Sequence, residues 1–174
     1  MTSVSTKQRR AATSAEAKAM AHPLRLRILR LCLDEARTNK ELADHLDMAP
    51  ATVLHHVRTL VDTGFLAPAE VRTGATGALE KPYLATRKSW DLDTTGMPED
   101  DTLSIAMVHA FRDEVLEGGP GALRNMARLG LRLNPASEEE LRTRLWEVVE
   151  DFAARPPDED GEPLALFVAM HRRP

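Results

Sequence analysis

The amino-acid sequence predicts a mainly helical protein with small β elements. Apolar residues recur at the spacing of one helix face in several stretches between residues 14 and 63. A strand, a glycine-rich turn and a second strand follow between residues 66 and 86. Aromatic residues make up only 4% of the chain, so the core must consist mostly of Leu, Val, Ala and Met. With 174 residues, 43% of them hydrophobic, the chain can form one medium domain or two small ones.

The first predicted helices lie between residues 14 and 35. Residues 1–13 are rich in Ser and Thr and carry three basic residues, which predicts a flexible basic arm. Ser14 is expected to cap a short helix that ends before His22 and Pro23. The next helix, residues 24–35, is apolar over a wide arc, so it should pack on more than one side.

Two further helices separated by a tight turn are predicted between residues 38 and 64. Thr38 and Glu41 have the spacing of a capping box, which begins the first of them. Pro50 suits the first turn of the second helix, and Gly64 suits the residue after its end. We call residues 50–63 the recognition helix. Its apolar residues fall on one stripe that should be buried: Val53, Val57 and Leu60.

The opposite face of the recognition helix is the candidate DNA-reading surface. It is small near its start, polar further along and carries one cation, properties that suit a helix in the major groove. The candidate residues are Ala51, Thr52, His55, Arg58 and Thr59. Neighbouring side chains point about 100° apart, so His56 should pack beneath the helix while His55 faces outward. An ordinary amphipathic hairpin with a solvated outer face fits these residues equally well.

The strands after the recognition helix favour DNA binding, because a hairpin in this position is a wing. Arg72 and Lys81 flank its tip, and we expect them, with Lys88, to contact the phosphate backbone. The charge distribution agrees. Residues 1–92 carry 14 Lys or Arg and 10 Asp or Glu, a net charge of +4, whereas residues 93–174 carry 9 Lys or Arg and 17 Asp or Glu, a net charge of −8. The positive charge therefore lies in the part of the chain with the predicted helix-turn-helix.

Residues 15–92 resemble the ArsR-type winged helix-turn-helix repressors. The resemblance is carried by residues 22–29 (HPLRLRIL), by residues 52–57 with Leu60 and Gly64 at their expected offsets, and by residues 81–86 (KPYLAT). It implies a DNA-binding domain over residues 14–92 that binds double-stranded DNA. This family often has serines along the recognition helix, where this chain has Ala49, Ala51 and Leu54, so the resemblance does not give the operator sequence.

A metal site is not expected. Metal sensors of the resembled family use a cysteine pair on an early helix, or Asp, His and Glu ligands on a late one. Here Cys32 is the only cysteine, and the acidic residues around His109 do not repeat with a second histidine at ligand spacing. We therefore predict no metal and no cofactor.

Residues 93–174 are predicted to form a small α+β lobe after a polar linker at residues 91–98. It should begin with a helix over residues 101–116 whose inward side carries Ile105, Val108, Phe111 and Val115. A strand at 129–133, a helix that begins with a Ser137–Glu140 capping box and ends at 154, and a strand at 164–170 should follow. Two strands with apolar faces are not stable alone. We therefore expect a dimerisation lobe that leaves room for a small apolar effector; a lobe packed only within its own chain is the alternative.

The leading hypothesis is a cytoplasmic, homodimeric, sequence-specific transcription regulator on a near-palindromic operator. The alternative is a winged-helix module for protein–protein contacts that does not bind an operator. An enzyme is not expected, because there is no phosphate-binding glycine loop and no recognisable nucleophile–base set. No apolar run approaches the length of a membrane span, the N-terminus lacks the apolar core of a secretory signal, and a lone cysteine excludes an intramolecular disulfide.

Overall fold

The structure is a computed structural model that describes residues 9–74 and 77–173. Its contacts divide these residues into two compact units. Residues 9–123 form the first, which we call the winged-helix unit, and residues 124–173 form most of the second, the C-terminal unit. Each is described by itself. The predicted fold class, mainly α with small β elements and a winged helix-turn-helix, is confirmed.

The winged-helix unit begins with α1 (Ser14–Met20) and α2 (Pro23–Leu31). Thr13, and not Ser14, caps α1, because Thr13 has the correct spacing to form a capping box with Glu16. The end of α2 was predicted at residue 35 but lies at Leu31. The backbone N–H of Ala85 donates to the Cys32 carbonyl (2.8 Å), an acceptor that a longer helix would need for itself.

The helix-turn-helix consists of α3 (Asn39–His45) and α4 (Pro50–Asp62). The predicted capping box is present, since the Thr38 N–H donates to Glu41 (2.7 Å) and the Glu41 N–H donates to Thr38 (3.1 Å). Pro50 occupies the first turn of α4. Gly64 follows the helix with φ +72°, the left-handed conformation that glycine adopts most easily. Both ends of the recognition helix are therefore close to their predicted positions.

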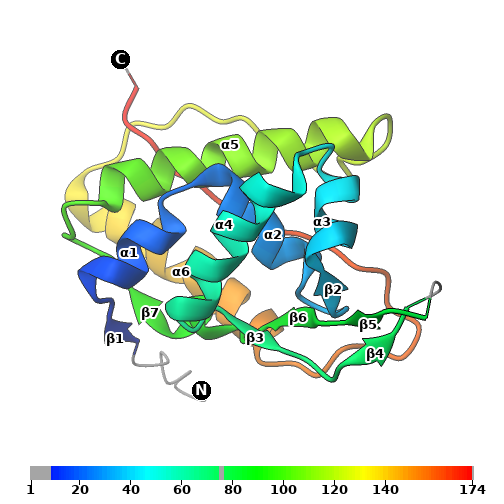
Figure 1. Ribbon diagram of the computed structural model, residues 1–174. Coiled ribbons are helices and arrows are strands. Elements are labelled where there is room, and N and C mark those ends of the chain that lie inside the picture. Colours follow the sequence, from blue (N-terminus) through cyan, green and yellow to red (C-terminus); the bar gives the residue numbers. More distant parts are fainter. Residues whose placement is uncertain (1–8, 75–76, 174) are drawn as a thin grey trace. The chain divides into compact units, whose positions relative to one another are not determined.

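Small sheets complete this unit (Figure 1). The strands β2 (Arg37–Thr38), β6 (Pro82–Ala85) and β3 (Leu66–Pro68) form an antiparallel sheet in that order. The wing continues as β4 (Arg72–Thr73) paired with β5 (Leu79–Glu80). A short 3₁₀ helix, η1 (Lys88–Asp91), leads to β7 (Leu92–Asp93), which pairs in parallel with β1 (Arg10–Ala11). The end of the predicted flexible arm is thus a strand, and residues 1–8 lie outside the described residues.

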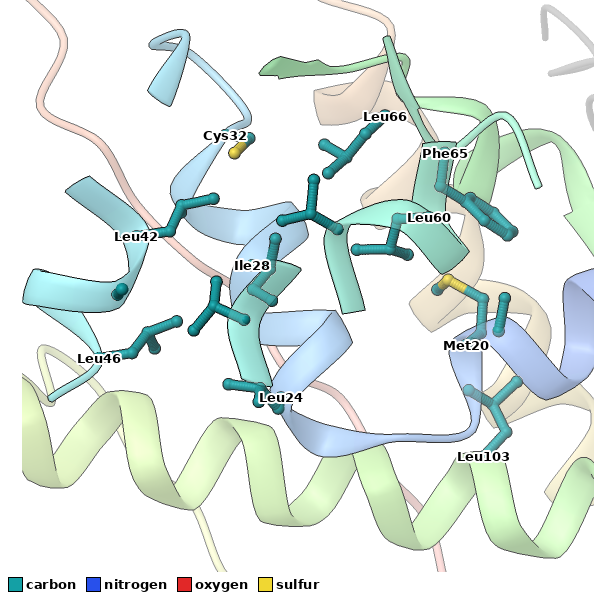
Figure 2. Packing of buried hydrophobic residues seen from close by; sticks show 14 of the residues in the cluster. Met20, Leu24, Ile28, Cys32, Leu42, Leu46, Leu60, Phe65, Leu66 and Leu103 are labelled. Atoms are coloured by element: carbon teal, nitrogen blue, oxygen red, sulfur yellow. The ribbon is translucent and has the colours of Figure 1, made fainter. Parts of the chain in front are cut away.

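The core lies where α2, α3, α4 and the first wing strand meet (Figure 2). The stripe predicted on α4 is fully buried: Val53, Val57 and Leu60 each have an exposed fraction of 0%. Phe65 and Leu66 continue this packing into β3. The recognition helix is therefore held by its apolar side, as the sequence predicted.

The helix α5 (Asp100–Gly118) packs against α1 and α2 (Figure 1). This is why the winged-helix unit extends to Leu123, well past the domain boundary expected at residue 92. Leu103, Ala106 and Ala110 form its buried face, whereas Ile105 and Val108, predicted to point inward, are exposed. Because α5 is apolar on both sides, its sequence did not select the face that packs.

Ion pairs fix the C-terminal half of α5. One carboxylate, Glu117, accepts from Arg27 of α2 and from Nε2 of His45 of α3, the latter at 2.6 Å. Arg30 lies 3.9 Å from Glu114. The helix is thereby connected to the first helix of the helix-turn-helix as well as to α2.

The C-terminal unit contains α6 (Pro135–Ala153) and, in its other described residues, chain with no helix or strand. The predicted Ser137–Glu140 capping box is wrong, because Asn134 caps α6 by accepting from the Ser137 N–H (2.9 Å) and Pro135 occupies the first turn. The strands predicted at 129–133 and 164–170 are also wrong. Neither segment forms a strand or pairs with one among the described residues. Both segments have the alternating apolar residues on which the prediction was based. Among the described residues, however, neither has a neighbouring strand with which to form backbone hydrogen bonds.

Candidate nucleic-acid interface

The outer face of α4 is uncovered in the described structure. Most of the residues proposed to read DNA have exposed side chains: Ala51, Thr52, His55 and Arg58. Thr59 is half-buried, and its hydroxyl donates to the His55 carbonyl (3.1 Å). The structure thus brings all five candidates to one side of one helix, opposite the buried stripe.

Two neighbouring histidines on α4 have different environments. His56 is buried, with 8% of its surface exposed, and its ring centroid lies 4.6 Å from that of His22. Burial lowers the pKa of His56 to about 4, so its imidazole is neutral at neutral pH. The prediction that His56 packs beneath the helix is confirmed, whereas the DNA contact of His55 stays a prediction.

The wing cations differ in how available they are. The Arg72 guanidinium binds two carboxylates, Glu80 at 3.1 Å and Glu41 of α3, and these raise the pKa of Arg72. Lys81 is exposed and forms no ion pair with the described part of the chain. A phosphate can therefore approach Lys81 freely but must compete with two carboxylates for Arg72.

Lys88 faces inward, against the expectation from sequence. Its Nζ lies 2.5 Å from a carboxylate oxygen of Glu16, donates to the Thr63 carbonyl at 2.6 Å and lies 5.1 Å from the centre of the Phe65 ring. This ammonium already has its partners inside the unit. We therefore leave Lys88 out of the proposed interface.

A groove lies between the recognition helix and the wing. It encloses about 320 Å³ and brings Arg58 of α4 and Lys81 of the wing to the same site. The other residues that line it are Leu54, Val57, Val61, Asp62, Pro68 and Tyr83. No sequence pattern identified Leu54, Asp62 or Tyr83 as residues of one groove, since this groove exists only once the wing folds back on α4.

The described residues contain neither a cluster of metal ligands nor a membrane-spanning helix. Within residues 9–74 and 77–173, no three His, Cys, Asp or Glu side chains are placed to hold a metal ion. In the same residues no helix combines the length and the apolarity needed to cross a membrane.

Comparison with known families agrees with this geometry. A family model described as "Helix-turn-helix domain" matches residues 20–68, which span α2, both helices of the helix-turn-helix and β3. The predicted helix-turn-helix domain is confirmed over these residues, while the resemblance to the ArsR-type regulators stays a prediction. No curated protein matches the chain.

Several solved structures align with most of the chain at low similarity. ZitR from Lactococcus lactis is 17% identical, with 78% of this chain and 86% of that chain covered and a TM-score of 0.34. AdcR from Streptococcus pyogenes is 19% identical, with coverages of 79% and 81% and a TM-score of 0.31. MepR from S. aureus, bound to an oligodeoxyribonucleotide, is 12% identical, with coverages of 77% and 78% and a TM-score of 0.31. Sequence identities and TM-scores this low support no conclusion about the function of this chain.

Proposed function

Starting from the helix-turn-helix domain over residues 20–68, we propose that the chain is a sequence-specific, DNA-binding transcription regulator that acts as a homodimer on a near-palindromic operator. One observation carries the proposal. The recognition helix is anchored by three fully buried residues, while its polar and basic side protrudes with no described side chain over it. A helix held in this way can enter a major groove without rearrangement.

The proposed contacts divide into base reading and backbone positioning. Thr52, His55 and Arg58 would read base edges, with Arg58 suited to guanine, while Ala51 and Thr59 fit closely against the groove. Lys81 would bind phosphate directly. Arg72 would bind phosphate only after its guanidinium had released a carboxylate that it now contacts. Arg58 and Lys81 line one groove, so the recognition helix and the wing would engage the same stretch of DNA.

Homodimerisation is supported by apolar surface that the chain leaves exposed. On α5 the exposed fraction is 58% for Ile105 and 72% for Leu116, and Met107 and Val108 are exposed beside them. A helix apolar on both sides normally packs on both. We propose a second copy as the missing neighbour, which would set two recognition helices about 34 Å apart on DNA. The apolar side chains of the C-terminal unit would suit a small apolar effector.

Selection of bound fragments from genomic DNA tests this function. We expect enrichment of one near-palindromic sequence, and sedimentation of the chain with that duplex should give two chains per duplex. If no sequence is enriched over random fragments, the operator-binding proposal fails and the protein-interaction module replaces it.

Replacing Arg58 with alanine should reduce sequence discrimination. The guanidinium is exposed on the reading face, so its loss should weaken operator binding by about 1–3 kcal/mol more than binding to random duplex. Fluorescence anisotropy with both duplexes measures the difference. Arg144→Ala, an exposed arginine on α6, is the matched control and should change neither affinity. Equal losses on the two duplexes would remove Arg58 from base reading.

Replacing Lys81 with alanine should weaken binding to all duplexes alike. Because a phosphate contact releases about one counterion, the slope of log affinity against log salt concentration should become shallower by about 1. Titrations at several salt concentrations measure this slope. An unchanged slope would show that Lys81 contacts no phosphate.

A further inference from the structure

Two imidazoles meet where the recognition helix packs on the start of α2. His22 caps α2, and its Nδ1 accepts from the Leu24 N–H at 3.2 Å, so this nitrogen carries no proton. His56 of α4 lies against it, with the ring centroids 4.6 Å apart and the planes inclined by 48°. The Nδ1 of His56 is buried and has no hydrogen-bond partner in the described part of the chain.

The surroundings of this pair are basic. The titratable and charged groups that act on His56 are His22 and Arg25 from α2 and His55 from its own helix. Arg25 is held beside the pair because its guanidinium donates to the carbonyl oxygens of Lys18 (2.6 Å) and Ala19. Burial first, and then these basic neighbours, lower the pKa of His56 to about 4 and also lower the pKa of His22.

We propose that the His22–His56 pair is an acid-sensitive latch, which holds the recognition helix against α2 only while both imidazoles are neutral. A proton on Nδ1 of His22 would remove the acceptor that caps α2. A proton on His56 would place a cation in a buried site beside Arg25 and His22. Either event favours separation of α4 from α2.

The direction of the pH dependence follows from the sign of the pKa shift. Both histidines have a lower pKa in the folded protein than the ordinary value of 6.5, so the open or unfolded chain binds protons more readily. The contribution of the latch to stability is therefore complete above about pH 6.5. It is lost as the pH falls from there toward about 4.

This latch predicts an effect opposite to the usual effect of acid on DNA binding. Acid usually adds positive charge to the exposed surface of a DNA-binding protein, which strengthens binding to phosphate. Opening of the latch displaces the whole reading face and weakens it. The DNA readout rests on the proposed function, whereas the opening of α4 can be measured without DNA.

Hydrogen exchange of the α4 amides in the full chain, corrected for intrinsic exchange rates, tests the latch. Between pH 7 and pH 5 the opening equilibrium constant of α4 should rise about twentyfold. In His56→Phe, which fills the site without titrating, the rise should be smaller than in the unmodified chain, because only His22 still titrates there. His171→Asn, at an exposed histidine of the C-terminal unit, is the matched control and should keep the full rise.

A second measurement decides the question if His56→Phe does not fold. NMR titration of the unmodified chain should give midpoints below 6.5 for both His22 and His56. Midpoints at or above 6.5, or an α4 opening constant independent of pH, would overturn the latch. If the chain binds no duplex at any pH, the proposed function fails, while exchange and titration still decide whether the latch exists. Where duplex binds, the ratio of the affinity at pH 5 to that at pH 7 should be lower for the unmodified chain than for His56→Phe.

Discussion

Replacing Phe65 with alanine is expected to lower the free energy of unfolding by about 3–5 kcal/mol. The side chain is only 1% exposed and is among the largest fully buried ones in the core. It follows Gly64, so it is the first residue after the turn that joins the recognition helix to the wing. Its backbone also lies between two contacts, donating to Leu60 (2.8 Å) and accepting from the Thr86 N–H (3.0 Å). Fixed in this way, the backbone cannot collapse to fill the cavity.

Urea unfolding followed by circular dichroism measures this loss. Leu79→Ala is the matched control, because Leu79 lies in the wing strand β5 with 79% of its surface exposed, and it should change stability by no more than about 0.5 kcal/mol. If Phe65→Ala cost no more than the control, Phe65 would not anchor the joint between helix and wing.

Replacing Glu16 with glutamine is expected to cost about 3 kcal/mol at neutral pH. Glu16 is 6% exposed, and its carboxylate accepts from Arg10 at 2.6 and 2.9 Å and lies 2.5 Å from Nζ of Lys88. It also accepts from the Thr13 N–H (2.8 Å). Glutamine keeps the shape of the side chain and an oxygen for Thr13, but leaves two cations without their counter-charge. The strand β1, α1 and η1 would lose the group that joins them.

The loss at Glu16 should depend on pH in a defined direction. The hydrogen bonds from Arg10 hold the pKa of the Glu16 carboxyl well below its ordinary value of 4.5, so its stabilising effect is present above pH 4.5 and is lost as the pH falls. The difference in unfolding free energy between the unmodified chain and Glu16→Gln should therefore shrink below pH 4.5. Glu139→Gln, on the exposed side of α6, should show little difference at any pH. A difference at Glu16 that is constant with pH would exclude the ionised network.

Features that depend on a few neighbouring residues were predictable from the sequence. The Thr38–Glu41 capping box, Pro50 at the first turn of α4 and Gly64 beyond its end each satisfy local backbone geometry. The buried stripe of α4 was equally clear, since helical periodicity alone defines it. The reading face is the complement of that stripe, so its exposure could also be inferred.

Features that depend on distant contacts were not predictable. The end of α2 is set by Ala85, which lies in the wing, and the inward orientation of Lys88 is set by Glu16 in α1. No short pattern contains either pair. The exposed side of α5 was misjudged because an apolar residue looks the same whether it meets its own chain or another. Alternation predicted strands in the C-terminal unit, but a strand also needs a neighbouring edge.

The carboxylate of Glu117 gives α5 a mechanical role. It contacts both Arg27 of α2 and His45 of α3. A shift of α5 along its axis would therefore either break both contacts or move α2 and α3 together with α5. If two protomers associate through the outer side of α5, a movement of α5 at this interface would therefore also move the helix-turn-helix. The geometry of the subunit interface would then determine the distance between the two recognition helices.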